Sequence, residues 1–255
     1  MISNKKWVLI NQFGFNPKKM FRGLLSLKKF YKDYKQFKKN YNGKINIQPC
    51  LHDWYESAGD ISSEYFIQDL HVAQLILSKN PIKHVDIGSR IDGFVANIAS
   101  SREIEIFDIR TINNTVKNII YRQCDIMVGD SKYINYTKSI SCLHSLEHFG
   151  LGRYGDPINP NGYISSFENL TKMLEVDGVF YLSVPLGIEL VDFNANRIFS
   201  ITTIMKLAND NNLSLEKLYT INNGELSEIA YTNEVEDQIN KIPYILGIFV
   251  FRKII

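Results

Sequence analysis

The stretch KHVDIG, residues 83–88, is a short β-type run that ends in a glycine. A second apolar run, IEIFD at residues 104–108, ends in an acid that follows this glycine by 20 residues. Glycine lets a backbone approach a ligand closely, and an acid at the end of the next strand can bind the two hydroxyls of a ribose. The two runs together predict a nucleoside-binding unit of strand, helix and strand.

On both sides of this unit, predicted strands alternate with predicted helices. We expect strands at residues 84–87, 104–107, 126–128, 140–143 and 179–184, and helices at 62–77, 94–100, 113–120, 165–174 and 202–211. Two last strands, at 215–221 and 244–252, suit an antiparallel hairpin at the sheet edge. The predicted fold class is therefore α/β, with a mostly parallel sheet and helices on both faces.

A polar loop follows the predicted strand at residues 140–143. The loop is part of the segment SCLHSLEHFGLGRYGDPINPNG, residues 141–162, which contains two histidines, two acids and an arginine. Four other candidates stand at or just after predicted strand ends: Asp86, Gly88, Asp108 and Asp130. Ligands of parallel sheets bind beyond the carboxyl ends of the strands, so we expect these residues and the loop around His144 to share one site.

Composition places the chain among ordinary globular proteins. Its 255 residues are 45% hydrophobic and 22% charged, which suits one large α/β domain with an appendage. The sequence contains no run of about 18 apolar residues and no secretory signal, so we expect a cytoplasmic protein. The three cysteines and five histidines lack metal-ligand spacing, which argues against a disulfide framework and against a metal site.

Positive charge is concentrated near the amino-terminal end. Twelve Lys or Arg residues and a single acid, Asp33, lie between Lys5 and Lys44, although the whole chain has a net charge of only +2. Apolar residues recur every three or four positions between Lys18 and Lys39, which predicts an amphipathic helix. We therefore divide the chain into a basic extension, residues 1–59, and one ligand-binding domain, residues 60–255.

The basic helix has several alternative roles, which the sequence leaves open. It can be a solvated helix without a partner, or it can be attracted to an anionic partner, either a phosphorylated substrate or the inner leaflet of a membrane. Peripheral membrane contact and pairing with a second copy in a homodimer both stay open. No nucleic acid partner is expected, because the extension has no recognised reading module and the rest of the chain is net acidic.

Successive motifs occur between Lys83 and Val184. They are DIG at 86–88, Asp108, VGD at 128–130, LHSLEH at 143–148 and FYLSVP at 180–185. In this order they resemble the motifs of class I S-adenosylmethionine-dependent methyltransferases. A longer pattern, LEHFGLGRYGDP at 146–157 with VDFNANRIF at 191–199, is similar to a bacterial branch of unknown function that carries the GLGRYGDP signature. Members of that branch often lie among genes for surface polysaccharides.

The resemblance implies a Rossmann-like methyltransferase sheet with S-adenosyl-L-methionine as cofactor. It also implies which residues contact the cofactor. Asp86 and Gly88 would line its methionine end, Asp108 would bind the ribose hydroxyls, and Asp130 would lie near the adenine amine. Leu143 and His144 would present their backbone beside the sulfonium. The implied reaction is O-methylation of a sugar, or of a phosphorylated or nucleotide-linked precursor, during the biosynthesis of a surface polysaccharide such as capsule or lipopolysaccharide.

Two positions depart from the family pattern. Arg90 stands where the usual turn has its second glycine, so a side chain narrows the approach to the cofactor unless Gly93 relieves it. Asn196 stands where we expect a histidine, which leaves the substrate contact in that segment open.

A sugar hydroxyl attacks a methyl group well only if its proton is removed. Histidine titrates near neutral pH, and general base catalysis typically contributes a factor of about 10² to 10⁴. His148 is the first candidate for the base, with Glu147 or Asp156 to orient or replace it. The structural alternative for His148 is a helix-cap or core histidine that packs beside the cofactor.

Arg153, Tyr154 and Arg197 are the predicted contacts of the acceptor. A guanidinium suits a phosphate or carboxylate, and a tyrosine ring can stack on a sugar or a base. The alternative is that the glycines around Arg153, with Pro157, form a rigid turn in which the charged residues pair with one another.

Other functions also stay open. One is methyl transfer to a phosphate-derived group of a glycan, which needs no hydroxyl base, and another is a module that binds the cofactor without turnover. A nicotinamide-dependent dehydrogenase is disfavoured, because the turn after Gly88 lacks the GxGxxG spacing.

Overall fold

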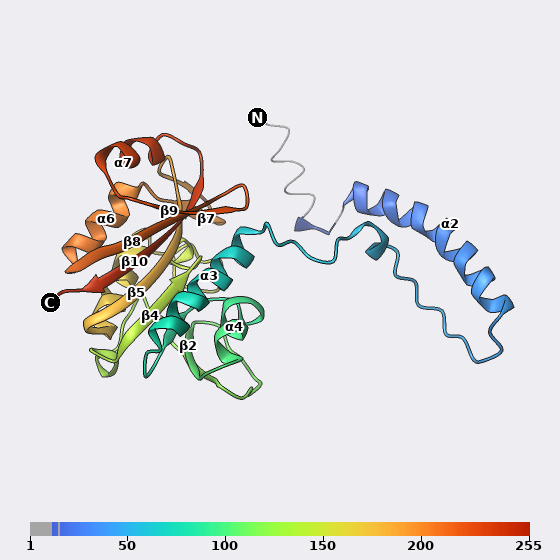
Figure 1. The fold of residues 1–255 in the computed structure, drawn as a ribbon, viewed down its shortest axis with the longest axis horizontal. Helices are drawn as coiled ribbons and strands as arrows, with labels where there is room; N and C mark the ends of the chain where they lie inside the picture. Colours follow the sequence, from blue (N-terminus) through green and yellow to red (C-terminus); the bar gives the residue numbers. More distant parts are fainter. Residues whose placement is uncertain (1–11, 15) are drawn as a thin grey trace. The chain divides into compact units, whose positions relative to one another are not determined.

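The computed structural model describes residues 12–14 and 16–255 and divides the chain into two compact units (Figure 1). Unit 1 is Met1–Asp60 and unit 2 is Ile61–Ile255.

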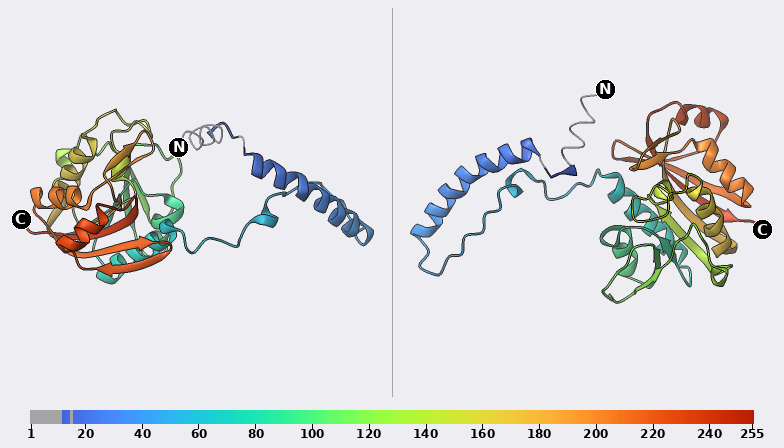
Figure 2. Two further views of the ribbon diagram at one scale, coloured as in Figure 1. Left: turned by 90° about the horizontal axis from the view of Figure 1, so that it is seen from above. Right: turned by 180° about the vertical axis from the view of Figure 1, so that it is seen from behind.

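Unit 1 is built around one long helix, α2 (Pro17–Lys39), which is drawn as one continuous helix in both views of Figure 2. The side chain of Asn16 accepts a hydrogen bond from the backbone N–H of Lys19 at 2.9 Å and so caps the helix. Pro17 suits the first helical position, where no backbone donor is needed. A segment without regular strands follows and includes the short 3₁₀ helix η1 (Asp53–Tyr55). Among the described residues, no helix has both the length and the hydropathy needed to cross a membrane.

Unit 2 contains a mixed sheet with the strand order β3-β2-β1-β4-β5-β10-β8-β9 (Figure 1). The parallel strands are β1 (Val85–Ile87), β2 (Ile104–Asp108), β3 (Ile119–Gln123), β4 (Thr137–Leu143) and β5 (Leu174–Leu186). The antiparallel strands are β8 (Leu213–Asn222), β9 (Glu225–Ile229) and β10 (Ile245–Lys253). A separate antiparallel pair consists of β6 (Leu190–Asp192) and β7 (Asn196–Ile198). The predicted fold class is confirmed.

Helices cover both faces of the sheet, and each face has its own apolar cluster. On one face pack α3 (Glu64–Lys79) and the π turn η2 (Ile91–Val95), which continues into α4 (Ala96–Ala99). On the other pack α5 (Gly162–Met173), α6 (Ile201–Asp210) and the end of α7 (Asn233–Ile239). Neighbouring residues of β5 alternate between the faces, since Tyr181 belongs to the first cluster and Phe180 and Leu182 belong to the second.

The central strands are buried along their whole length. Every residue of β1 and β2 is buried, because β1 pairs with β2 on one side and with β4 on the other while helices cover both faces. Burial on both faces explains why these strands read as continuous apolar runs rather than as alternating ones. Asp86, Glu105 and Asp108 are the charged residues in these two strands, and because they are buried they need hydrogen-bond or ionic partners.

Two predicted elements between β2 and β4 are wrong. Residues 113–120 do not form a helix, because Asn118 turns the chain with a φ of +68° and Ile119 begins β3. Ile119 and Ile120 then pair with β2, where β-branched side chains fit well. Residues 126–128 consequently form a turn instead of the predicted strand.

The two carboxyl-terminal strands pair antiparallel, as predicted, but they do not form a hairpin together. β10 lies between β5 and β8, and β8 forms its hairpin with β9. β9 was not predicted; it is a short edge strand whose residues are all at least partly exposed. The helix α7 fills part of the connection from β9 to β10 and was also not predicted.

Candidate functional site

A pocket opens at the carboxyl ends of β1 to β4, the rim at which open parallel sheets bind ligands. Its empty volume of about 980 Å³ includes space open to solvent. The lining comes from residues 87–90, 107–110, 124–127 and 143–145, from the loop residues 148, 149, 153, 154 and 156, and from Tyr65, Gln68 and Asp69 of α3. The predicted site residues among them are Gly88, Asp108, Leu143, His144, His148, Arg153, Tyr154 and Asp156.

Gly88 forms a turn at the end of β1 that requires glycine. Its φ is +70°, and a Cβ at this position would lie 2.2 Å from the Ser145 hydroxyl oxygen. Arg90, which replaces the second glycine of the family pattern, has a side chain that is 73% exposed and forms an ion pair with Asp92 at 2.7 Å. The guanidinium of Arg90 is therefore engaged at the surface.

Asp86 lies beneath the pocket rather than in its lining. Its carboxylate accepts hydrogen bonds from the backbone N–H and hydroxyl of Ser89 at 3.2 and 2.8 Å, and from the hydroxyl of Ser141 at 2.5 Å. Complete burial raises the pKa of Asp86 to about 7, although these hydrogen bonds oppose the rise. Asp86 thus fixes the turn after β1 through Ser89 and is not placed to contact a ligand itself.

Asp108 ends β2 at the pocket and is held by Arg110. Oδ1 accepts hydrogen bonds from the backbone N–H and Nε of Arg110 at 2.8 and 2.9 Å, and Oδ2 accepts one from Nη2 at 2.5 Å. A carboxylate offers about four acceptor positions, so Oδ2 keeps one for a hydroxyl group. Arg110 was not among the predicted site residues.

The third acid of the pocket is Asp125, not Asp130. Asp125 follows β3 in the lining, and its Oδ1 accepts a hydrogen bond from the backbone N–H of Met127 at 2.9 Å. Asp130 instead borders a neighbouring hollow and forms an ion pair with Lys132 at 2.7 Å. Asp125 therefore lines the pocket, and Asp130, the predicted contact of the adenine amine, does not. Asp125 was not predicted because the strand was expected at residues 126–128, after this acid, whereas β3 ends at Gln123, before it.

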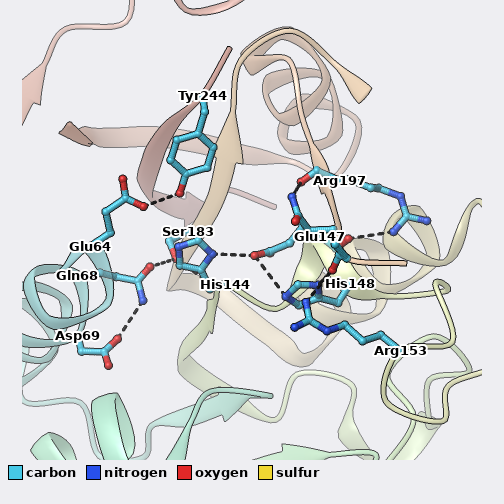
Figure 3. Close-up of polar contacts among 12 residues, drawn as sticks. Glu64, Gln68, Asp69, His144, Glu147, His148, Arg153, Ser183, Arg197 and Tyr244 are labelled. Carbon is cyan, nitrogen blue, oxygen red and sulfur yellow. Dashed lines mark hydrogen bonds and ion pairs between the residues drawn. The ribbon is translucent and has the colours of Figure 1, made fainter. Parts of the chain in front are cut away.

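His144 and Glu147 form a buried pair at the floor of the pocket (Figure 3). The Nδ1 atom of His144 lies 2.8 Å from Oε1 of Glu147, and the carboxylate can only accept, so Nδ1 carries the hydrogen. The His144 side chain is 7% exposed, and its Nε2 has no hydrogen-bond partner among residues 12–14 and 16–255. In the same part of the chain, Oε2 of Glu147 is likewise buried without a partner. A buried polar atom without a partner is costly, and a bound ligand can supply that partner.

The backbone fixes the position of His144. Its φ is +48°, a conformation unusual for a residue other than glycine. Its backbone nitrogen lies 3.1 Å from both the carbonyl oxygen and the hydroxyl oxygen of Ser183, and its ring packs on Tyr65 with centroids 4.5 Å apart and an interplanar angle of 32°. Ser183 in turn donates to Gln68, so α3 and the end of β4 are tied together (Figure 3).

His148 lies on the other side of Glu147, with Nε2 3.8 Å from Oε1 of that carboxylate. Its Nδ1 lies 2.8 Å from the carbonyl oxygen of Ala195, which can only accept a hydrogen bond. The hydrogen of neutral His148 is therefore on Nδ1, and the lone pair is on Nε2. Burial lowers the pKa of His148, so the neutral form dominates at pH 7.

The glycine-rich loop is organised by Asp156. Its carboxylate accepts hydrogen bonds from the backbone N–H groups of Gly150, Gly152 and Tyr154 at 2.8, 3.0 and 3.1 Å. Gly150 has a φ of +78°, and a Cβ there would lie 1.9 Å from the carbonyl oxygen of Asn159. These contacts support the rigid turn of the alternative, but the charged side chains bond to backbone groups and not to one another. Asp156 organises the loop through these contacts.

Arg153 and Tyr154 form the outer wall of the pocket together with Arg110. The guanidinium groups of Arg110 and Arg153 lie 4.7 and 5.2 Å from the centroid of the Tyr154 ring. Arg153 also donates a hydrogen bond to the carbonyl of Ala195 at 2.8 Å. Cationic groups therefore flank an aromatic ring at the mouth of the pocket, an arrangement that favours an anionic ligand.

Arg197 lies outside the pocket and is buried behind the loop. Its guanidinium donates to the carbonyl oxygens of Glu147, Phe149 and Pro160 at 3.2, 2.7 and 3.1 Å. With its donors used in this way, Arg197 positions the loop and does not contact an acceptor. This corrects the predicted substrate role of Arg197.

Three residues of α3 complete the lining and were also not predicted. Gln68 donates a hydrogen bond to Asp69 at 2.9 Å and accepts one from Ser183, while Tyr65 covers His144. Burial raises the pKa of Asp69. The only signal in the sequence was that two polar residues, Gln68 and Asp69, interrupt the apolar face of the predicted helix. In the part of the chain that the structure describes, no group of three His, Cys, Asp or Glu residues is arranged to hold a metal ion.

Comparison with solved structures identifies the fold. Similar structures include a putative methyltransferase from Bacillus halodurans C-125, 13% identical, which covers 73% of this chain and 99% of that chain with a TM-score of 0.51. The N-methyltransferase NodS from Bradyrhizobium japonicum WM9, in complex with S-adenosyl-L-homocysteine, is 13% identical. The match covers 78% of this chain and 91% of the NodS chain, with a TM-score of 0.50. An S-adenosylmethionine-dependent methyltransferase from Clostridium acetobutylicum ATCC 824 is 11% identical. The match covers 75% of this chain and 93% of that methyltransferase, with a TM-score of 0.51. At these identities the likeness establishes the fold alone.

Comparison of sequences identifies the family. No curated protein matches the chain. A family model matches residues 96–254, which include the GLGRYGDP loop and every strand after β1. The resemblance had implied a bacterial branch of unknown function, whereas the description of the matching family names Caenorhabditis and no bacterial group. Because the match spans more than half of the sequence, the chain belongs to the DUF268 family, described as Caenorhabditis protein of unknown function.

Proposed function

We propose that this protein is an S-adenosyl-L-methionine-dependent O-methyltransferase that acts on an anionic sugar derivative. The observation that carries the proposal is the pocket at the carboxyl ends of β1 to β4, which gathers Gly88, Asp108 and the two imidazoles on either side of Glu147. The fold supports it, because the solved structures compared above are named as methyltransferases.

The residues of the pocket fit the cofactor. The turn at Gly88 has no Cβ, so its backbone can approach the methionine end, beside the buried carboxylate of Asp69. Asp108 keeps one acceptor position, which a ribose hydroxyl would use, and Asp125 in the lining would contact the adenine end. The Nε2 of His144 lacks a protein partner and would gain one from the cofactor or the acceptor. When bound, the cofactor supplies a methyl carbon attached to a positively charged sulfur.

His148 is the proposed base for the acceptor hydroxyl. Its Nδ1–H is fixed on the carbonyl of Ala195, so Nε2 can take the proton as the new oxygen–carbon bond forms. Glu147 lies 3.8 Å from this Nε2 and would stabilise the resulting imidazolium. His144, the first residue after β4, would border the methyl group instead, because Tyr65 and Ser183 fix its ring and backbone. Catalysis of this kind depends on holding the reacting atoms in place.

The acceptor would be bound by the wall of Arg153 and Tyr154. Arg153 presents a guanidinium to a phosphate or carboxylate, and Tyr154, 39% exposed, offers a ring on which a sugar or base can stack. A sugar phosphate or nucleotide sugar of surface polysaccharide biosynthesis meets both requirements. Arg110 and Arg153 together also support the second candidate, methyl transfer to the phosphate-derived group itself.

A turnover assay tests the proposal. The full chain is incubated with S-adenosyl-L-methionine and a panel of sugar phosphates and nucleotide sugars, and released S-adenosyl-L-homocysteine is measured. We expect release that depends on one acceptor class, is lost in Asp108→Asn and persists in Asp130→Asn, which changes an equivalent acid outside the pocket. Cofactor binding without release for any acceptor would instead favour the non-catalytic module.

A further inference from the structure

The helix α2 of unit 1 exposes apolar side chains that nothing in the described part of unit 1 covers. They form an apolar band of Met20, Phe21, Leu24, Leu25, Leu27 and Tyr31, with side chains that are 37 to 63% exposed. An isolated exposed apolar residue is ordinary, but a contiguous group on one helix marks a surface with a partner.

The chain covers the opposite side of the same helix. Ser26 is buried, and Phe30 and Tyr34 are half-buried beside the segment that follows α2. Two cationic side chains of α2 pack on aromatic rings of η1. The Lys29 ammonium lies 4.2 Å from the centroid of the Trp54 ring, and the Arg22 guanidinium lies 5.1 Å from the centroid of the Tyr55 ring. The covered side and the apolar band are therefore distinct surfaces of α2, and the described residues of unit 1 pack on the first of them.

Charge decides which partner suits the apolar band. The helix carries nine Lys or Arg residues and one acid, Asp33, a net charge of +8, while the rest of the chain has a net charge of −6. Asp33 is itself paired with Lys29. The basic residues continue on the side of the apolar band, because Lys28 and Lys32 follow Leu24 by one and two helical turns. Long lysine stems can extend from an apolar layer to negative groups beside it.

We propose that α2 binds the surface of an anionic lipid bilayer, with the apolar band inserted among the acyl chains and the lysines at the lipid phosphates. Basic amphipathic helices lie in this way in the plane of a membrane. A second copy of α2 is a poorer partner, because two helices of net charge +8 repel each other when their apolar bands meet. The proposal concerns unit 1 and stands independently of methyl transfer.

Sedimentation with vesicles tests the proposal on the full chain. The vesicles contain phosphatidylcholine alone or phosphatidylcholine mixed with phosphatidylglycerol, at low and high salt. We expect binding to the mixed vesicles only, and loss of binding at high salt. Lys28→Gln, Lys32→Gln and Lys35→Gln combined should weaken binding roughly a hundredfold, since each basic residue near an anionic surface contributes about 1 kcal/mol, or about fivefold.

Matched variants separate the two parts of the surface. Leu24→Ser with Leu25→Ser removes apolar area from the band and should also abolish sedimentation. Ile82→Ser with Val128→Ser changes two apolar residues of unit 2 that are even more exposed, and it should leave sedimentation unchanged. Lys138→Gln, Lys206→Gln and Lys241→Gln combined form the charge control in unit 2. Unchanged helix content by circular dichroism, for the variants in α2, and unchanged thermal unfolding, for the variants in unit 2, would exclude a folding defect.

Two outcomes would overturn the proposal. Equal sedimentation with neutral and anionic vesicles would mean that anionic lipid is not recognised. No sedimentation, together with a mass of two chains in light scattering that Leu24→Ser with Leu25→Ser reduces to one, would assign the apolar band to a second copy of the protein.

Discussion

At the scale of single residues, Glu147 connects the two imidazoles of the pocket. Oε1 lies 2.8 Å from Nδ1 of His144 and 3.8 Å from Nε2 of His148, and the carboxylate is 1% exposed. A buried carboxylate requires compensating hydrogen bonds or charge. The two histidines thus differ in their partners. Among the described residues, Nε2 of His144 has no hydrogen-bond partner, whereas Nδ1 of His148 is held by the carbonyl oxygen of Ala195.

The role of His148 can be tested by replacement. His148→Ala should lower kcat by a factor of about 10² to 10⁴, the usual contribution of a general base, and should leave cofactor affinity nearly unchanged. His71→Ala is the control, because His71 lies outside the pocket and packs on Tyr219. Steady-state kinetics and calorimetry check both quantities. An equal loss of turnover and cofactor affinity would show that His148 merely packs beside the cofactor.

The pH profile provides an independent check on the same residue. A base must be unprotonated, and burial lowers the pKa of His148 below its ordinary value. The rate should therefore stay constant as the pH falls to the ordinary histidine pKa of about 6.5 and should decline only below it. A decline that begins above neutral pH would contradict this assignment, and the profile of kcat/KM for the free enzyme measures it.

At the scale of elements, the end of β1 depends on a buried acid. Burial raises the pKa of Asp86 to about 7, so between about pH 4 and 7 the folded state holds a proton that the unfolded state has lost. The contribution of Asp86 to the free energy of unfolding is complete below about pH 4 and is lost as the pH rises through 7. The neighbouring His84, whose pKa burial lowers to about 3, acts in the opposite direction.

Asp86→Asn isolates this contribution because asparagine does not ionise. Relative to the wild type, the variant should gain stability as the pH rises from 4 to 7, by an amount on the order of 4 kcal/mol. The exposed replacement Asp210→Asn on α6 should show no comparable gain. Denaturant unfolding across this pH range measures the difference. A constant difference between Asp86→Asn and wild type would mean that Asp86 titrates as an exposed acid does.

The glycine loop after η4 (Leu146–His148) offers a matched pair of substitutions. Gly150 and Gly155 have φ values of +78° and +87°, so alanine is strained at both, by about 1 to 2 kcal/mol. A Cβ at Gly150 would also lie 1.9 Å from the carbonyl oxygen of Asn159, whereas a Cβ at Gly155 meets nothing within 4 Å. Gly150→Ala should therefore destabilise the protein far more than Gly155→Ala in thermal unfolding. Equal destabilisation by the two substitutions would mean that the loop moves to accommodate a Cβ at Gly150.

The sequence predicted elements well where apolar runs are bounded by turns. β1, β2, β4 and α5 lie close to their predicted ranges. The three strands are almost entirely buried, and α5 buries one side that includes Phe167, Leu170 and Met173. The helix predicted at 113–120 was wrong, because β3 at the sheet edge is only half-buried and its pairing with β2 is a non-local contact. Asp125 was not predicted because β3, which ends before it, was not predicted.

The sequence did not predict the hydrogen-bond partners of individual side chains. As an acid and a guanidinium, Asp156 and Arg197 suggested binding of an acceptor hydroxyl and of an anionic acceptor. In the structure, however, the Asp156 carboxylate accepts hydrogen bonds from backbone N–H groups, and the Arg197 guanidinium donates to backbone carbonyls. Tyr65 and Gln68 reach the pocket from α3, which precedes β1 in the chain and belongs to no pocket motif. Such contacts depend on tertiary packing that a linear pattern does not contain.

At the scale of the whole molecule, the chain combines two units of opposite charge character and different chemistry. Unit 2 is a Rossmann-like methyltransferase sheet whose pocket lies at the carboxyl ends of β1 to β4, and unit 1 carries the basic helix α2. The family match begins within unit 2 at residue 96, so α2 and the apolar band lie outside the matched residues.

The central claim is that the pocket of unit 2 binds S-adenosyl-L-methionine. Calorimetric titration of the full chain with this compound, with S-adenosyl-L-homocysteine and with NAD tests it most directly. We expect saturable binding of the two sulfur compounds alone, unchanged in Asp130→Asn and weakened roughly ten- to a hundredfold in Asp108→Asn, which loses a charge-assisted hydrogen bond to the ribose. Absence of binding, or equal affinity in Asp108→Asn and wild type, would contradict the account.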